Sequence, residues 1–307
     1  MRLITRSDFD GLVCAILLEE QEIVSDYLFV HPKDVQDGNV PVTKNDVLAN
    51  VPYVPGCGLW FDHHASELAR VKLAGFEHTG AIVEDAPSCA QVIWDYYGGA
   101  KSFKKLLIPI LKAVNRSDSA GFLEQEILFA EGWVLLSFIM DPRTGLGLYS
   151  DYSISNYQLM RDLIQYCKTM SIDEILALPD VEERAIRYNE HQAPYKDMLR
   201  RCSRVERNVV ITNLLNEKII YCGNRFIIFA SHPDQNIELR IFKGKNQENV
   251  VLSCGHSIFN QTSKTDIGKL LGKYGGGGHR QVGSCQASFN DWERFSEEIV
   301  AQMVSDG

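Results

Sequence analysis

The sequence predicts an α/β protein with an N-terminal, mostly parallel sheet flanked by helices, a helical connector, and a smaller C-terminal α/β domain with a mixed sheet. Short apolar strands alternate with amphipathic helices over the first half of the chain, which is typical of parallel sheets. Beyond residue 205, segments rich in Val, Ile and Phe are separated by Asn and Gly, which indicates further strands. A length of 307 residues corresponds to about two domains. We therefore expect domains over 1–170 and 205–307, joined by a connector over 171–204.

Composition and charge exclude several classes of protein. The eight cysteines lie far apart with no Cys-x-x-Cys pair, so we expect neither a zinc ribbon nor a disulfide framework. The net charge of −9 argues against binding of duplex nucleic acid, which needs many basic contacts to phosphate. No long apolar run and no signal peptide are present, so the sequence predicts a cytoplasmic protein without a membrane span.

The chain begins with a predicted strand over residues 2–5, an acidic loop over 7–11 and a buried helix over 12–20. In open α/β sheets, ligands bind at the carboxyl edge of the strands, where this loop lies. Asp8 and Asp10 can therefore place two carboxylates at one ligand site. The alternative is that Asp10 only caps the helix, which leaves Asp8 unexplained.

Three more strands are predicted over residues 26–30, 47–50 and 59–61. The last of them leads directly into Asp62, His63 and His64. Carboxylate oxygen and imidazole nitrogen together suit manganese, zinc or iron. The alternative is a surface turn in which three polar residues happen to follow a strand.

The helical part of the chain offers two more candidate residues. Predicted helices cover 88–97, 103–114, 126–140 and 156–168, and a long charged helix covers 181–204, broken or bent near Pro194. Asp118 follows the second helix and is either a metal ligand or an ordinary turn residue. Arg143 lies in a turn and offers one guanidinium.

The C-terminal part has a run of four glycines followed by a histidine and an arginine. We predict strands over 209–211, 219–221, 226–229, 237–242 and 250–252, a helix over 266–274, a strand near 284–289 and a helix from Asp291. One glycine is enough to end a helix, so the excess suggests backbone N–H groups that bind an anion. The residues of this predicted phosphate grip are Gly276, Gly277, Gly278, His279 and Arg280. The alternative is a flexible loop.

These features, in this order, resemble the DHH phosphoesterase superfamily with its DHH-associated C-terminal domain, in particular its oligoribonuclease, phosphoadenosine-phosphate phosphatase and exopolyphosphatase-related branch. The resemblance implies a two-manganese site in the N-terminal domain and a smaller domain that closes over it and grips the substrate. It also implies roles for individual residues: Asp8, Asp10, His63 and Asp118 as metal ligands, His64 as a catalytic or phosphate-contacting imidazole, and Asp62 as a support for His63.

The sequence departs from the family pattern at two places. Arg6 and Ile4 stand where the family has a metal-binding histidine, and Asn50 stands where it has an aspartate that bridges both metals. A neutral amide does not screen two dications as a carboxylate does. We therefore expect one manganese site on Asp10, His63 and Asp118, and a weak or empty second site where Arg6 supplies charge instead.

Two functions follow from the sequence. The first is a manganese-dependent phosphohydrolase acting on an oligonucleotide, a nucleotide bisphosphate or a polyphosphate, with Arg6, Asp62 and His64 as catalytic residues and Arg143 binding the substrate. The second is a weakened family member that binds a nucleotide or phosphate without turning it over. The sequence is also compatible with a homodimer.

Overall fold

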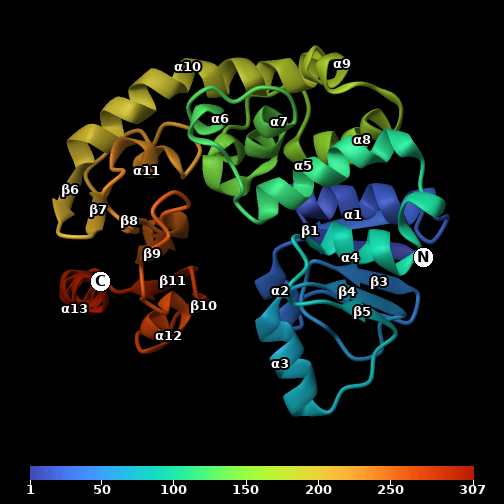
Figure 1. Ribbon diagram of the computed structural model, residues 1–307, viewed down its shortest axis with the longest axis horizontal. Helices are drawn as coiled ribbons and strands as arrows, with labels where there is room; N and C mark the ends of the chain where they lie inside the picture. The colour runs from blue at the N-terminus through green and yellow to red at the C-terminus, as the bar shows by residue number, and fades with distance from the viewer. The chain divides into compact units, whose positions relative to one another are not determined.

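The computed structural model describes residues 1–307, with the side chains of all of them except Lys245. The chain forms two compact units (Figure 1). The first unit comprises Met1–Phe122 and Ala130–Arg187, and the second comprises Leu123–Phe129 and Tyr188–Gly307. Among the described residues, no helix is both long enough and apolar enough to cross a bilayer.

The first unit is built on a five-stranded sheet with the strand order β2-β1-β3-β4-β5. All neighbouring strands in it are parallel, which confirms the predicted fold class. The strands are β1 (Arg2–Arg6), β2 (Asp26–Val30), β3 (Asp46–Ala49), β4 (Leu59–Asp62) and β5 (Gly80–Ile82). Strand β5 has only three residues, Gly-Ala-Ile, and its sequence pattern is too short to predict it.

Helices cover both faces of this sheet. Ile4, Leu48 and Trp60 pack against Val35 of α2 (Pro32–Gln36) and Val71 of α3 (Ala65–Ala74). Successive residues of a strand point to opposite faces of the sheet. The strand residues next to Ile4, Leu48 and Trp60 therefore point to the other face. Helices α1 (Phe9–Glu20) and α4 (Cys89–Tyr96) cover that face. The other helices pack on these two or on one another: α5 (Ile108–Asp118), α7 (Gly132–Met140), α8 (Asn156–Thr169) and α9 (Ile172–Leu176).

Three helix predictions need correction. The predicted helix over 126–140 is two helices, α6 (Glu124–Leu128) and α7, because Gly132 takes a left-handed backbone conformation with φ of 54° that a continuous helix excludes. The helix at 103–114 begins later, after a 3₁₀ turn at Lys105–Leu107. Helix α10 (Pro179–Cys202) continues through Pro194, so the predicted break is wrong, and the predicted bend at this residue stays a prediction.

The second unit is built on a six-stranded mixed sheet with the order β10-β11-β9-β8-β7-β6. Only β7 and β8 are parallel neighbours, and α12 (Ile267–Gly272) and α13 (Trp292–Asp306) contribute to the core beside this sheet. The strands are β6 (Ser203–Glu206), β7 (Val209–Asn213), β8 (Ile237–Lys243), β9 (Val250–His256), β10 (Gly277–His279) and β11 (Val282–Ala287).

Two predicted strands in this unit are wrong. Residues 219–221 form no strand, and the apolar run at 226–229 begins the short helix α11 (Ile227–Ser231). Phe226, Ile227, Ile228 and Phe229 are all buried. A short run that is apolar on every side has no periodicity that separates a buried strand from a buried helix.

Candidate metal centre

The predicted ligands gather at the carboxyl edge of the parallel sheet. Asp8 follows β1 and caps the N-terminus of α1, where its carboxylate accepts a hydrogen bond from Gly11 N at 2.9 Å. Asp10 lies inside the first turn of α1 rather than at the cap. The alternative that Asp10 is only a helix cap is therefore wrong, since Asp8 has that role.

The Asp10 carboxylate is held by the N-terminus of helix α4. Its two oxygens accept hydrogen bonds from Cys89 N at 3.0 Å and Ala90 N at 2.9 Å, so the positive end of the α4 dipole faces it. Burial nevertheless raises the pKa of Asp10 well above its usual value, and the charges of Asp118 and Asp8 add to that rise. A carboxylate in this position gains strongly from a nearby cation.

His63 presents a lone pair to two carboxylates. Its Nδ1 lies 3.1 Å from the carbonyl oxygen of Ala86, and because a carbonyl can only accept, Nδ1 carries the proton. Neutral His63 therefore has a bare Nε2, which lies 3.2 Å from Asp118 Oδ2 and 4.0 Å from Asp10 Oδ2. This Nε2 is buried without a hydrogen-bond partner. A lone pair facing carboxylate oxygens fits a divalent cation placed between them.

Asp118, the last residue of α5, completes this group. One ligand atom from each of Asp10, His63 and Asp118 lies within 4.8 Å of the others, so a single ion can reach all three. Partial burial raises the pKa of Asp118; His63 opposes that rise and Asp8 adds to it. The set of two carboxylate oxygens and one imidazole nitrogen suits manganese, iron or zinc.

Asp62 supports His64, not His63 as the family resemblance implied. Asp62 is fully buried, and its Oδ1 lies 2.6 Å from His64 Nδ1, while His63 is oriented by Ala86. Asp62 also accepts the backbone N–H of His63 at 2.8 Å, which fixes the turn. Burial lowers the pKa of His64, but the Asp62 hydrogen bond and the neighbouring carboxylates outweigh it, so the pKa is raised overall.

Arg6 and Asn50 both contact Asp8. Arg6 Nε forms an ion pair with Asp8 Oδ2 at 2.9 Å, and Asn50 Nδ2 donates to Asp8 Oδ1 at 3.3 Å. Asn50 follows β3, is buried, and has a φ of 55°, a conformation that asparagine tolerates better than most residues. Of the two residues that depart from the family pattern, Arg6 therefore neutralises Asp8 and Asn50 donates a hydrogen bond to it.

Arg143 lies close enough to interact with the carboxylate cluster. Asp141 holds its guanidinium through contacts of 2.7 and 2.8 Å from Nε and Nη2. Burial lowers the pKa of Arg143, but the charges of Asp141, Asp8 and Asp118 raise it overall. The positive charge of Arg143 therefore lies within electrostatic range of Asp8 and Asp118.

The glycine run belongs to the second unit and is partly a strand. Gly277, Gly278 and His279 form β10, which pairs with β11, so the run is more ordered than a flexible loop. A Cβ on Gly276 would lie 2.3 Å from Ser284 O, and one on Gly278 would lie 2.3 Å from Val282 O. Close backbone packing therefore requires these two glycines.

Gly277 is different, because a Cβ there would meet nothing within 4 Å and its φ is not positive. Packing within this unit does not require a glycine at this position. The open space at Gly277 leaves room for a ligand to approach the Gly277 backbone, as the predicted phosphate grip requires.

Sequence reasoning missed the backbone partners of the ligands. The N–H groups of Cys89 and Ala90 hold Asp10, and the carbonyl of Ala86 orients His63. The available signal was Ser88, which caps α4 by accepting from Gln91 N. A capped helix start marks a set of N–H groups that can bind an anion, but nothing in the sequence says which carboxylate they face.

No protein-family model matches the chain, and no curated protein matches it. Among solved structures, the pGpG-specific phosphodiesterase PggH from Vibrio cholerae is 46% identical, with a TM-score of 0.84 over 100% of this chain and 99% of that one. The Mn²⁺ complex of RecJ from Thermus thermophilus is 13% identical, with a TM-score of 0.53 over 99% of this chain and 52% of RecJ. The DHH domain of a member of a ribosomal protein family is 11% identical, with a TM-score of 0.56 over 98% of this chain and 86% of that one. At such low identity, the last two show a shared fold alone.

Proposed function

Because the chain is a member of the DHH phosphoesterase superfamily, we propose that it is a manganese-dependent phosphodiesterase that hydrolyses short 5′-phosphorylated dinucleotides such as pGpG. The observation that carries this proposal is the 46% identity, over nearly the whole of both chains, to a pGpG-specific phosphodiesterase. The reaction adds one water across one P–O bond, so pGpG yields two molecules of GMP.

The proposed metal ligands are Asp10, His63 and Asp118, with Asp8 beside them. The bare Nε2 of His63 and the raised pKa values of Asp10 and Asp118 support this assignment, since a cation would relieve both features. A bound Mn²⁺ would act as a Lewis acid on a phosphate oxygen and lower the pKa of a water.

His64 is the proposed proton donor to the leaving oxygen. Its raised pKa keeps more of the imidazole protonated near neutral pH, and Asp62 fixes the orientation of the ring. Arg143 is the proposed contact for a non-bridging phosphate oxygen, because it is fixed by Asp141 and carries a permanent charge. In the second unit, His279, Arg280 and the backbone at Gly277 are the proposed contacts for the second phosphate or the base.

The test measures GMP release from pGpG by the purified chain with Mn²⁺, with EDTA and with Mg²⁺. We expect hydrolysis with Mn²⁺, none with EDTA, and a loss of rate of more than about 100-fold in Asp118→Asn. Asp162→Asn is the matched control, because Asp162 lines a hollow with Val24 and Ser25, at the amino end of β2 and away from the ligand edge. No GMP under any metal condition contradicts the proposal.

The runner-up function is a nucleotide-binding protein without turnover. The ion pair of Arg6 with Asp8 and the neutral amide of Asn50 favour it, because they occupy positions where the family pattern has metal ligands. It predicts saturable binding of pGpG by calorimetry with no GMP formed.

A further inference from the structure

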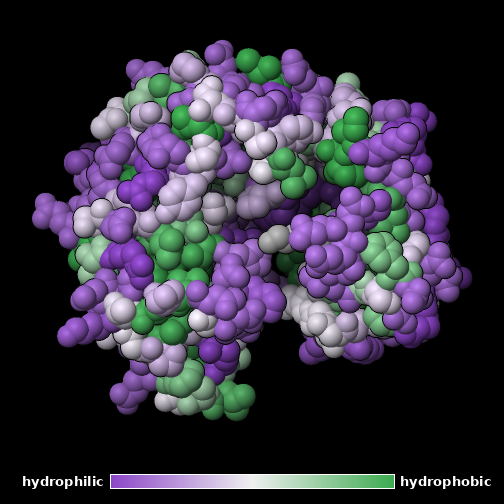
Figure 2. Space-filling model, turned by 180° about the vertical axis from the view of Figure 1, so that it is seen from behind, coloured by the Kyte–Doolittle hydropathy of each residue, from purple (hydrophilic) through white to green (hydrophobic). Residues whose placement is uncertain are grey.

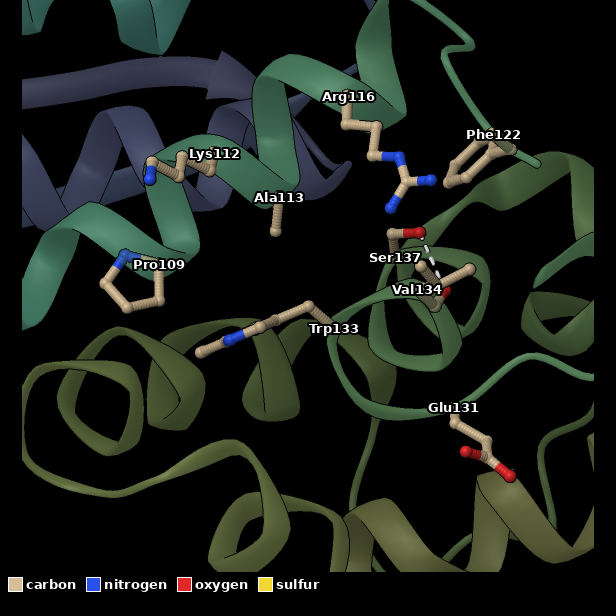
Figure 3. Close-up of a pocket in the computed structure, with 9 residues that line it drawn as sticks. All are labelled: Pro109, Lys112, Ala113, Arg116, Phe122, Glu131, Trp133, Val134 and Ser137. Atoms are coloured by element: carbon tan, nitrogen blue, oxygen red, sulfur yellow. Dashed lines mark hydrogen bonds between the residues drawn. The ribbon is translucent and has the colours of Figure 1, made fainter.

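A hollow of about 220 Å³ lies between helices α5 and α7 of the first unit (Figure 3). It shares no residue with the candidate metal centre. Residues at one-turn spacing on α5 form one wall, and the start of α7 forms the other. The lining residues are Pro109, Lys112, Ala113, Arg116, Phe122, Glu131, Trp133, Val134 and Ser137.

The hollow combines an aromatic surface with two cations. Figure 3 shows the Trp133 ring extending from α7 towards the side of α5 that carries Pro109 and Ala113. Lys112 and Arg116 are one turn apart on α5, where like charges repel, and Lys112 has no ion-pair partner among the described side chains. In the same view Glu131 lies apart from both cations. Arg116 is held by a hydrogen bond from its Nε to Gly121 O at 2.8 Å. In a chain of net charge −9, the two positive side chains still make a local site for an anion.

Both helices that line the hollow lead to the candidate metal centre. Helix α5 ends at Asp118, two residues after Arg116, which is about 3 Å along the helix axis. Helix α7 is followed by the turn that carries Arg143. The Trp133 ring also packs against Phe9, with centroids 6.4 Å apart, and Phe9 lies between Asp8 and Asp10 in the chain.

We propose that this hollow binds one nucleotide unit of the substrate, with its base stacked on Trp133 and its phosphate near Lys112 and Arg116. The assignment rests on the proposed function and adds to it a subsite for the substrate. The volume is smaller than the roughly 300–1,000 Å³ of pockets that enclose drug-sized ligands, so it suits a single base rather than a dinucleotide. Aromatic stacking and a cation pair are the chemistry by which proteins hold single-stranded nucleotides.

The kinetic test compares Trp133→Ala and Lys112→Ala with the parent on pGpG and on bis(p-nitrophenyl) phosphate, a diester without a nucleobase. Each variant should raise KM for pGpG about tenfold or more, because one stacked base is worth roughly that factor or above. The loss should be larger on pGpG than on the base-free diester, and Trp133→Phe, which keeps an aromatic ring, should restore the KM for pGpG. Trp292→Phe and Lys105→Ala are the matched controls, since both residues lie outside the hollow.

A binding measurement separates this proposal from the proposed function. GMP added to the parent should quench tryptophan fluorescence, and the quenching should disappear in Trp133→Phe while GMP still binds by calorimetry. If pGpG is not hydrolysed but this quenching occurs, the proposed function fails and the subsite stands. If Trp133→Ala leaves both the KM for pGpG and the affinity for GMP unchanged, or if GMP neither binds nor quenches, the subsite proposal is wrong.

Discussion

Changing Arg6 to His and Asn50 to Asp together should increase the number of manganese ions that the chain binds. Both residues contact Asp8, at 2.9 Å from Arg6 and 3.3 Å from Asn50. Arg6→His removes a positive charge and adds an imidazole ligand. Asn50→Asp replaces a neutral amide with a carboxylate at the position where the family resemblance implies a bridging ligand.

The expected size of the effect follows from the charges. A unit charge and a dication about 4 Å apart repel by about 2 kcal/mol in water and by about 8 kcal/mol at an effective dielectric of 20. The Arg6 side chain is 33% exposed, so the lower value is the appropriate one. A change of about 2 kcal/mol corresponds to roughly 30-fold in dissociation constant. Because both substitutions act on the same ion, their combined effect should exceed the sum of the single effects.

The assay is calorimetric titration of Mn²⁺ into the parent, the two single variants and the double variant, with pGpG hydrolysis measured in parallel. We expect the stoichiometry to rise from about one towards two and the rate to rise with it. Arg2→His is the control, because Arg2 lies at the amino end of β1, the strand that ends at Arg6, and pairs with Asp46 instead of Asp8. If the parent already binds two ions tightly, or if both changes lower the rate, Arg6 and Asn50 are working parts of a specialised site.

Three further predictions concern single residues. His63→Ala should weaken Mn²⁺ binding by more than about 100-fold in calorimetry, since even losing an outer partner of a ligand costs about 10–100-fold. Asp62→Asn should lower the pKa of His64, because the substitution removes the carboxylate that raises it. The protonated form of His64 is lost as pH rises through this pKa, so the alkaline limb of the pH–rate profile should move to lower pH. An unmoved limb would mean that another group is the acid. Gly276→Ala should lower the free energy of unfolding by about 1–3 kcal/mol through overpacking. Gly277→Ala should leave the melting temperature unchanged and weaken pGpG binding. An equal loss of stability in the two variants would contradict this expectation.

The fold class was predictable because its signal is distributed over many residues. Four of the five parallel strands were identified by buried apolar runs that alternate with amphipathic helices. The elements that failed carry little local information. Strand β5 consists of three residues with no polar alternation, and the run at 226–229 is buried on all sides. Whether such a segment becomes a strand or a helix depends on its contacts with residues far away in the sequence.

The family was predictable because its features occur in a fixed order along the chain, and the structural relatives confirm it. The predicted ligands Asp10, His63 and Asp118 do come together, because parallel strands end at one edge of the sheet. Their role as metal ligands stays a prediction. The mistaken partner for Asp62 has a simple cause: His63 and His64 are adjacent, and their side-chain directions depend on the turn that follows β4.

The candidate binding features of the first unit are local: the ligand edge, Arg143 and the hollow beside Trp133. On the face drawn in Figure 2, hydrophilic residues are in the majority.

The charges around the ligand edge also explain how so acidic a site can fold before a cation binds. Three of the carboxylates have a positive partner in direct contact: Arg6 for Asp8, the start of α4 for Asp10, and His64 for Asp62. Asp118 differs, because it faces the His63 Nε2 that is buried without a hydrogen-bond partner. The unsatisfied contact is therefore between His63 and Asp118, and a cation placed there would gain the most. This is why we expect the first manganese ion to bind between them, and why a second ion at Asp8 must displace the Arg6 ion pair.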